Sequence, residues 1–178
     1  MNQLIPPANI LIRRAIADEA LRIAWVLYQA FVEFEPLYTP AAFAATTPAS
    51  DQIQKRWSEG PVWVATQGDQ PVGTISSIPN RKGLYIRSMA VLPAARGHGI
   101  GHFLLHAAEQ FAMMQGHQRM FLSTTPFLSA AIRLYEQFGF QRSNERPNEL
   151  FGTPLFAMIK LLEPANEAEL DITKISIE

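Results

Sequence analysis

Three glycines and an arginine lie within six residues of one another in the segment Arg96–Gly101, directly before an apolar helical pattern. Glycines between a strand and a helix let the backbone approach a ligand closely and adopt positive φ values. The first N–H groups of a helix lack helical partners, and the helix dipole favours an anion beside them. Arg96 adds a permanent positive charge. The segment therefore predicts a phosphate or pyrophosphate site built mainly from main-chain amides, although such a motif alone also fits a plain glycine-rich connection.

The spacing of the glycines separates three kinds of phosphate site. A P-loop needs Lys followed by Ser or Thr after its last glycine, whereas Ile100, Gly101 and His102 stand here. A dinucleotide fingerprint needs G-x-G-x-x-G at the opening of the first βα unit. The spacing here is G-x-G-x-G, at Gly97, Gly99 and Gly101, and it follows four expected strands. The remaining hypothesis is a cradle for the pyrophosphate of coenzyme A.

Three histidines near this segment, His98, His102 and His106, are spaced by four and share one face of the expected helix. Such spacing resembles that of metal ligands. No cysteine or suitably placed acid accompanies them, and they occupy the face opposite the apolar stripe, where polar residues belong. We therefore predict no metal site, and we expect His98 and His102 to contact phosphate instead.

The composition limits the class of protein. At 178 residues the chain is long enough for one good core and short for two. The formal net charge of −1 lacks the basic excess of nucleic-acid binding proteins, so we expect no nucleic-acid partner. The absence of cysteine excludes disulfides and thiolate metal sites. There is no secretory signal pattern and no apolar run of about 18 residues, so we expect a cytoplasmic protein without a membrane partner.

Hydrophobic periodicity predicts the elements that position these residues. The expected strands are 10–16, 83–93, 119–125, 154–162 and a hairpin over 60–78 that turns at Gly68-Asp69-Gln70. The expected helices begin after Asp18, at Thr47-Pro48, at Ile100 and at Ser129. The order is βααβββαβαβ, with a further strand near Phe140. We see no repeat or linker and predict one domain over 1–162, followed by a tail over 163–178 that is either loose or an edge strand.

Two of the expected helices carry apolar residues at helical spacing. The first has its stripe at Leu21, Ala24, Trp25, Tyr28, Phe31 and Val32. The one after the glycines has its stripe at Ile100, Phe103, Leu104, Ala107, Ala108, Phe111 and Met114. The aromatic run from Phe31 to Ala45 follows the first helix and is interpreted as an acceptor-binding lid, a dimer contact or core.

Two segments stand in a characteristic order and separation. In IRSMAVLPAARGHGIGHFLL, a strand ends in an apolar-Val-x-Pro run and is followed by R-x-x-G-x-G at Arg96, Gly99 and Gly101. In AAIRLYEQFGFQR, the pattern A-x-x-L-Y-E-x-x-GF covers a helix and its end. Together they resemble the GNAT family of N-acetyltransferases over about residues 10–162.

The resemblance implies an α/β (α+β) architecture, the acyl-CoA N-acyltransferase fold: a mixed, mostly antiparallel sheet flanked by helices and splayed between 84–92 and 119–125. Acetyl-CoA would lie in that splay, because a splayed strand exposes N–H and C=O groups that the pantetheine arm can pair with. The implied cofactor contacts are Met89, Ala90, Val91, Arg96, Gly97, His98, Gly99, Ile100, Gly101 and His102. No metal is implied.

The resemblance also implies direct acetyl transfer to an amine. Main-chain N–H groups near Val91 would stabilise the developing oxyanion. Tyr135 would protonate the departing thiolate, since its ordinary pKa of about 10 lies above that of a thiol. Tyr135 also lies on an apolar helical stripe, so a purely structural role in the core is the competing interpretation.

Two departures from the family pattern leave parts of the site open. Leu128 stands where the family often has an asparagine that contacts the CoA arm, so Ser129 or Thr125 would have to replace that contact. The strand before Pro93 lacks the glutamate that many members use as base. Glu33 and Glu35, in a region that often shapes the acceptor site, are the candidate substrate residues. A water chain with Ser88 or Ser123 as its polar wall is the alternative.

The favoured function is an acetyl-CoA-dependent N-acetyltransferase acting on a primary amine of a small molecule or a protein, and a homodimer is a reasonable expectation. The alternative is a CoA-binding module or sensor without transferase activity. A third class, a nucleotide-binding domain, would bind ATP or NAD rather than acetyl-CoA. The motifs carry no information about the identity of the acceptor.

Overall fold

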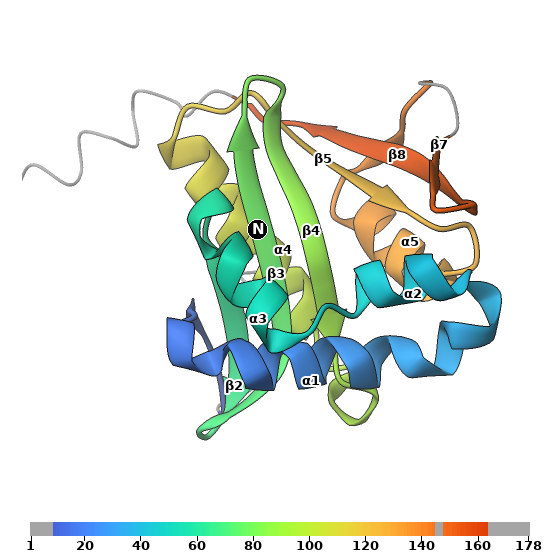
Figure 1. The fold of residues 1–178 in the computed structure, drawn as a ribbon. Helices are drawn as coiled ribbons and strands as arrows, with labels where there is room; N and C mark the ends of the chain where they lie inside the picture. Colours follow the sequence, from blue (N-terminus) through green and yellow to red (C-terminus); the bar gives the residue numbers. More distant parts are fainter. Residues whose placement is uncertain (1–8, 145–147, 164–178) are drawn as a thin grey trace, which may run out of the picture.

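The computed structural model describes residues 9–144 and 148–163 and forms one eight-stranded sheet with helices on both faces (Figure 1). The strands are β1 (Ile10–Arg14), β2 (Val62–Gln67), β3 (Gln70–Asn80), β4 (Gly83–Val91), β5 (Arg119–Thr124), β6 (Gln141–Arg142), β7 (Asn148–Leu150) and β8 (Thr153–Leu161). The helices are α1 (Ala20–Phe31), α2 (Pro40–Thr46), α3 (Ser50–Lys55), α4 (Ile100–Met114) and α5 (Ser129–Gln137). Short 3₁₀ turns lie at Ala17–Glu19, Val32–Leu37, Arg56–Glu59 and Pro93–Ala95.

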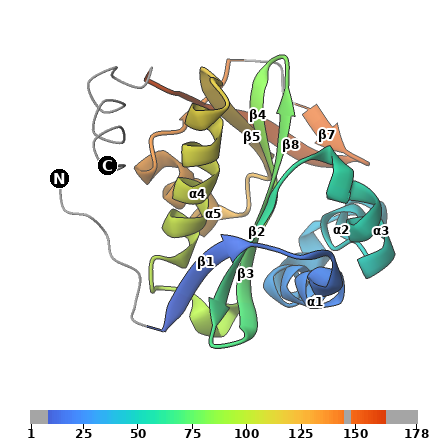
Figure 2. The ribbon, with the colours of Figure 1, turned by 90° about the vertical axis from the view of Figure 1, so that its left-hand side faces the viewer.

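The strand order is β1-β2-β3-β4-β5-β8-β6, with β7 paired to β8. Every pair is antiparallel except β4 and β5, which run parallel. Figure 2 shows α4 and α5 on one face of the sheet and α1 with α3 on the other. Three buried hydrophobic clusters result among the described residues: one centred on Leu104, Met120 and Met158, a second on Val26 and Val64, and a small third of Tyr38, Ala42 and Phe43. The expected mostly antiparallel sheet flanked by helices is confirmed.

Strands β4 and β5 diverge along their length (Figure 1). They pair only over three positions, Leu84–Ile86 against Met120–Leu122. Beyond them β4 carries a bulge, because the register with β3 shifts between Thr74 and Ser76, and Ser88 adopts a φ of 53°. Among the described residues, the rest of β4 therefore has no strand partner on the β5 side, which confirms the expected splay.

Two sequence predictions about the helices are wrong in detail. The first helix packs through Ile23, Val26 and Leu27, whereas Leu21 is 71% and Trp25 53% exposed. This helix is apolar on nearly every side, so periodicity could not choose the face that meets the sheet. The helix expected at Thr47-Pro48 begins instead at Ser50.

Helix α2 was not predicted, although its start follows the usual rules. Thr39 is its N-cap and accepts a hydrogen bond from the Ala42 amide at 3.2 Å, and Pro40 occupies the first turn. It lies inside the aromatic run that was left open as lid, dimer contact or core. Strand β7 was also missed, and the predicted tail over 163–178 lies, from 164 onward, outside the described residues.

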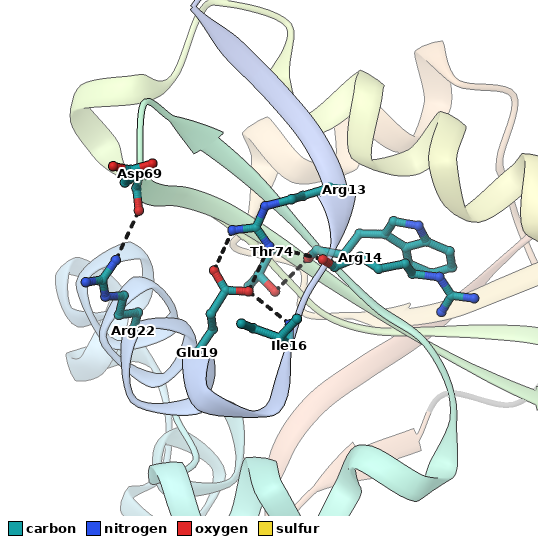
Figure 3. Close-up of polar contacts among 8 residues, drawn as sticks. Arg13, Arg14, Ile16, Glu19, Arg22, Asp69 and Thr74 are labelled. Atoms are coloured by element: carbon teal, nitrogen blue, oxygen red, sulfur yellow. Dashed lines mark hydrogen bonds and ion pairs between the residues drawn. The ribbon is translucent and has the colours of Figure 1, made fainter.

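The start of α1 is tied to β1 by Glu19 (Figure 3). Its carboxylate accepts hydrogen bonds from Arg13 Nη1 and Nη2, at 2.9 and 2.7 Å, and from the Ile16 amide at 3.0 Å. Asp18, the expected cap, lies in the preceding 3₁₀ turn instead. One helical turn further on, Arg22 donates to the Asp69 carbonyl at 3.0 Å. These bonds fix α1, and with it the segment after α1 that borders the site.

Glu19→Gln is expected to lower the free energy of unfolding by about 1 to 2 kcal/mol at pH 7. The hydrogen bonds from Arg13 lower the folded-state pKa of Glu19 below its ordinary 4.5. The stabilisation is therefore present above pH 4.5 and is lost as the pH falls through the lowered value. Urea titrations at pH 7 and pH 3 measure this, and the difference between wild type and variant should shrink at pH 3.

The matched control is Asp51→Asn, which removes the exposed ion pair with Lys55 and should change stability little at either pH. An equal loss for Glu19→Gln at both pH values would contradict the charge-based explanation.

Among residues 9–144 and 148–163, no helix has both the length and the apolar character that crossing a membrane requires.

Candidate active site

A cavity of about 330 Å³ opens between the end of β4, the glycine-rich turn and α5. Nine of the ten predicted cofactor residues line it: Met89, Ala90, Val91, Arg96, Gly97, Gly99, Ile100, Gly101 and His102. The splay and the turn thus form one continuous concave surface. We call this the donor cavity.

The three glycines of the turn are required for two different structural reasons, backbone conformation and close packing. Gly97 and Gly99 have φ values of 81° and 73°, in the left-handed region that disfavours side chains. Gly101 has ordinary helical geometry, but a Cβ there would lie 2.6 Å from Leu134 Cδ2 and 3.2 Å from Met89 Cε. It therefore lets α4 pack closely on α5 at the floor of the donor cavity.

The N-terminus of α4 points its first amides at this turn. Gly99 is the N-cap and supplies no side-chain hydrogen bond, and the first helical bond closes from the Phe103 amide to the Gly99 carbonyl at 3.2 Å. The amides of Ile100, Gly101 and His102 precede that bond, so they are available to an anion. This fits the pyrophosphate of coenzyme A, the group that the spacing of the glycines suggested.

Arg96 lines the donor cavity but its guanidinium is already held by the protein. Nη1 donates to Glu33 at 2.6 Å, Nη2 to the Ala30 carbonyl at 3.0 Å and Nε to the Val91 carbonyl at 3.3 Å. Arg96 therefore joins the glycine-rich turn to the end of α1. These three bonds leave one N–H on each Nη atom for the predicted phosphate contact.

The two predicted acceptor-site carboxylates line neither the donor cavity nor the second cavity that adjoins it, which is described below. Glu33 is bound to Arg96, and Glu35 is exposed on the same 3₁₀ turn. The lining of the donor cavity and of the cavity beyond it contains neither residue. His98 is likewise absent from the lining, and its Nδ1 lies 3.4 Å from the Ala95 carbonyl.

His102 is the histidine that lines the donor cavity. Its ring packs edge-on against Phe138, with 4.9 Å between ring centroids. Burial, followed by the nearby His106 and Lys160 charges, lowers the pKa of His102 from 6.5, so the neutral ring dominates at pH 7. The described residues contain no group of three His, Cys, Asp or Glu side chains placed to hold a metal ion.

Tyr135 stands between the donor cavity and a second cavity of about 380 Å³. The two cavities share four lining residues: Phe31, Met89, Leu128 and Tyr135. Tyr135 is 8% exposed, and burial raises its pKa well above the ordinary 10. Its ring packs against Phe140 at 5.9 Å between centroids. The side chain is thus both a core aromatic and a wall of the two cavities.

The second cavity is bounded by β4, β5, α2 and the β7–β8 hairpin. Its polar lining is Tyr38, Thr46, Arg56, Tyr85, Arg87, Ser88, Ser123, Thr124 and Thr125. No aspartate, glutamate or histidine is part of this lining among the described residues. We call it the acceptor cavity.

Several of these residues were missed by the sequence analysis. Arg56 lies in an element without a recognisable motif, and Arg87 lies in the first motif segment at a position that the motif does not mark. Their meeting depends on how α3 docks beside β4. Tyr38 lies in the aromatic run, where clustering of aromatics was the available signal. Ser88 and Ser123, named as a polar wall for water, both line the acceptor cavity. Leu128 lies at the junction of the cavities, with Ser129 on the donor side and Thr125 on the acceptor side.

Comparison with protein families identifies the chain. The acetyltransferase (GNAT) family model matches residues 27–140, which contain the glycine-rich turn, α4 and Tyr135. The chain belongs to the GNAT acetyltransferase family. The resemblance inferred from the two segments is confirmed.

Curated GNAT relatives differ in how much of the chain they cover. The chain is 35% identical to probable N-acetyltransferase family 8 member 5 of Mus musculus over 94 residues, 49% of this chain and 41% of that protein. It therefore spans less than half of that relative's length. It is 29% identical to the uncharacterized N-acetyltransferase YjgM of Escherichia coli (strain K12) over 147 residues, 79% of this chain and 87% of that protein.

Solved GNAT structures share the fold. The structure of yncA, a putative acetyltransferase from Salmonella typhimurium with its cofactor acetyl-CoA, has a TM-score of 0.69 and 25% identity over 87% of this chain and 95% of that one. The PaiA N-acetyltransferase of Thermoplasma acidophilum in complex with coenzyme A has a TM-score of 0.73 over 86% of this chain and 99% of that one. At 16% identity, the latter similarity concerns the fold alone.

Proposed function

We propose that this chain is an acetyl-CoA-dependent N-acetyltransferase that transfers an acetyl group to a primary amine of a small molecule or a protein. The observation that carries this proposal is the junction of two cavities at Met89 and Tyr135. One cavity has the amides and glycines suited to a pyrophosphate, and the other is a separate space for an acceptor. A transfer enzyme needs such an arrangement, because donor and acceptor must meet in a fixed geometry.

The residues of the donor cavity fit coenzyme A. The amides from Gly97 to His102 would hold the pyrophosphate at the start of α4. The close packing at Gly101, where a Cβ would crowd Leu134 and Met89, holds this helix start against α5. The edge of β4 at Met89 and Val91 lacks a strand partner on the β5 side among the described residues and would hydrogen-bond the amide-like pantetheine arm, beside the bond that the Val91 carbonyl already accepts from Arg96 Nε. Acetyl-CoA itself would supply the acetyl group as an activated thioester. No part of this binding requires a metal.

Tyr135 would act as the general acid. Its burial raises its pKa, so it keeps its proton at neutral pH and can donate it to the departing sulfur. Main-chain N–H groups near Val91 would hold the thioester oxygen while negative charge develops on it. Because Tyr135 borders both cavities, it can reach the reacting atoms from either side.

The proton of the incoming amine would leave through water in the acceptor cavity, with Ser88 and Ser123 as its polar wall. The absence of a carboxylate from the described lining disfavours a side-chain base. The same observation favours the second candidate, a CoA-binding module or sensor without transferase activity. The two functions differ in turnover and not in acetyl-CoA binding.

The test is release of free CoA from acetyl-CoA in the presence of a broad panel of amines, measured with a thiol reagent. Calorimetric binding of acetyl-CoA is measured in parallel. Binding together with amine-dependent CoA release supports the enzyme, whereas binding with no release for any amine supports the sensor. Binding of ATP or NAD without binding of acetyl-CoA would overturn both. The cytoplasmic location and the homodimer stay predictions, which cell fractionation and light scattering test.

A further inference from the structure

The acceptor cavity carries two arginine side chains and no compensating acid in its described lining. Arg56 opens the 3₁₀ turn after α3, and Arg87 lies in the middle of β4. Both belong to the lining, so their guanidinium charges act on whatever enters. The two arginines share one carboxylate, Glu59, which lies outside the described lining, so the pair keeps an excess of positive charge that an anion would offset.

Arg87 is held in place. Its Nη2 donates to Glu59 at 2.5 Å, and its side chain is 27% exposed. The Nε atom is buried and has no hydrogen-bond partner among the described residues. The single contact to Glu59 therefore leaves most of the five donors of this guanidinium unused.

The Arg56 side chain has fewer contacts to polar groups than the Arg87 side chain. None of the hydrogen bonds or ion pairs within 9–144 and 148–163 involves its side chain. Burial, and after it the Arg87 charge, lowers the pKa of Arg56, while Glu59 opposes that effect. The two guanidinium groups are thus near enough to repel each other. Glu59, three residues after Arg56, forms its ion pair with Arg87.

We propose that Arg56 and Arg87 bind a carboxylate on the acceptor, so that the substrate class is an amine that also carries a carboxylate. This rests on the proposed function, since it assigns the acceptor of the same site. Two guanidinium groups suit a carboxylate because each offers parallel N–H donors to its two oxygens. Arg87 and Met89 lie two residues apart in β4, at most about 7 Å along the strand. A small amino acid can therefore reach from the arginines to the junction of the cavities.

The arginines also act on the amine. An ammonium group close to fixed positive charges has a lowered pKa, because those charges disfavour its protonated form. The two arginines therefore favour the neutral amine, the nucleophilic form, while Glu59 opposes that effect. The substrate carboxylate offsets part of the arginine charge while it anchors the molecule.

The test compares L-amino acids with the amines formed by removing their carboxyl group, under the same CoA-release conditions. Dipeptides and their C-terminal amides form a second set, which distinguishes a free amino acid from a peptide as the source of the carboxylate. The wild type is expected to prefer the carboxylate-bearing member of a pair by about tenfold or more in kcat/KM.

Arg56→Gln should remove most of that preference, chiefly by raising KM, and Arg56→Lys should restore part of it. Loss of packing alone would affect both members of a pair equally. Arg81→Gln, in the exposed β3–β4 turn, is the matched control and should leave the preference unchanged. Equal kcat/KM for both members in the wild type, or an unchanged preference in Arg56→Gln, would overturn the proposal.

Binding of the same compounds to CoA-loaded protein separates this proposal from the proposed function. If no amine is acetylated, the enzyme function fails. The carboxylate site then stands if amino acids bind to the CoA-loaded wild type more tightly than to the CoA-loaded Arg56→Gln variant. Equal affinities in the two proteins would overturn it.

Discussion

Tyr135→Phe is expected to lower kcat by about 10²- to 10⁴-fold, the range of a general acid, and to leave the Kd for acetyl-CoA nearly unchanged. The change removes one oxygen from a side chain that borders both cavities and keeps the ring that packs on Phe140. The fold and the donor cavity should therefore persist. Steady-state kinetics and calorimetry on the same preparations measure the two effects.

The raised pKa of Tyr135 adds a second observable. Because the protonated form is the donor, Tyr135 should cause no fall in the rate below about pH 10. The control is Tyr28→Phe, on the exposed side of α1, which should leave both kcat and the acetyl-CoA Kd unchanged. Turnover of Tyr135→Phe at the wild-type rate would show that the ring serves only the core and that another group protonates the sulfur.

Gly97→Asp is expected to weaken acetyl-CoA binding by about 100-fold relative to Gly97→Asn. Gly97 lies in the left-handed region, with a φ of 81°, which Asn and Asp tolerate better than other side chains. A Cβ at this position meets no atom within 4 Å, so neither substitution is blocked by a neighbour. The two variants have nearly the same shape and differ in one negative charge beside the expected pyrophosphate. Like charges about 5 Å apart repel by about 3 kcal/mol at an effective dielectric constant of 20, which is about 100-fold in affinity.

Calorimetry at low and high salt checks this explanation. The gap between the Asp and Asn variants should narrow as salt rises, because the repulsion acts across an exposed turn and is screened. The Asn variant reports the backbone cost alone. Equal affinities for the two variants would place the pyrophosphate away from the glycine-rich turn.

The donor side of the site was largely predictable because its parts are adjacent in sequence. A strand end, a glycine-rich turn and a helix start follow one another from Met89 to His102, and local rules describe each. Nine of the ten predicted residues indeed line one cavity. The role of Arg96 was harder to foresee, because its partners Ala30 and Glu33 lie more than 60 residues away.

The acceptor side was not predictable in the same way. Its walls come from α2, the turn after α3, β4, β5 and the β7–β8 hairpin, which meet only when the sheet has formed. Glu33 and Glu35 carried the right chemistry but lie outside the cavity, whereas Arg56 and Arg87 line it at positions that no motif marks. The face of α1 that packs on the sheet was misjudged for a similar reason, since an almost uniformly apolar helix has no preferred side until a partner is present.

The sequence by itself determined the order of most elements, the anion-binding turn at Arg96–Gly101 and the family resemblance that marks Tyr135, because each depends on residues close together in the chain. Only the tertiary structure decided at which residue, Ile86, the pairing of β4 with β5 ends, that Arg96 is tied to the end of α1, and that two arginines line the acceptor cavity. These features arise from the packing of distant segments, whose register and docking depend on the whole sheet. The acceptor is therefore encoded in the fold of the chain and not in any one of its motifs.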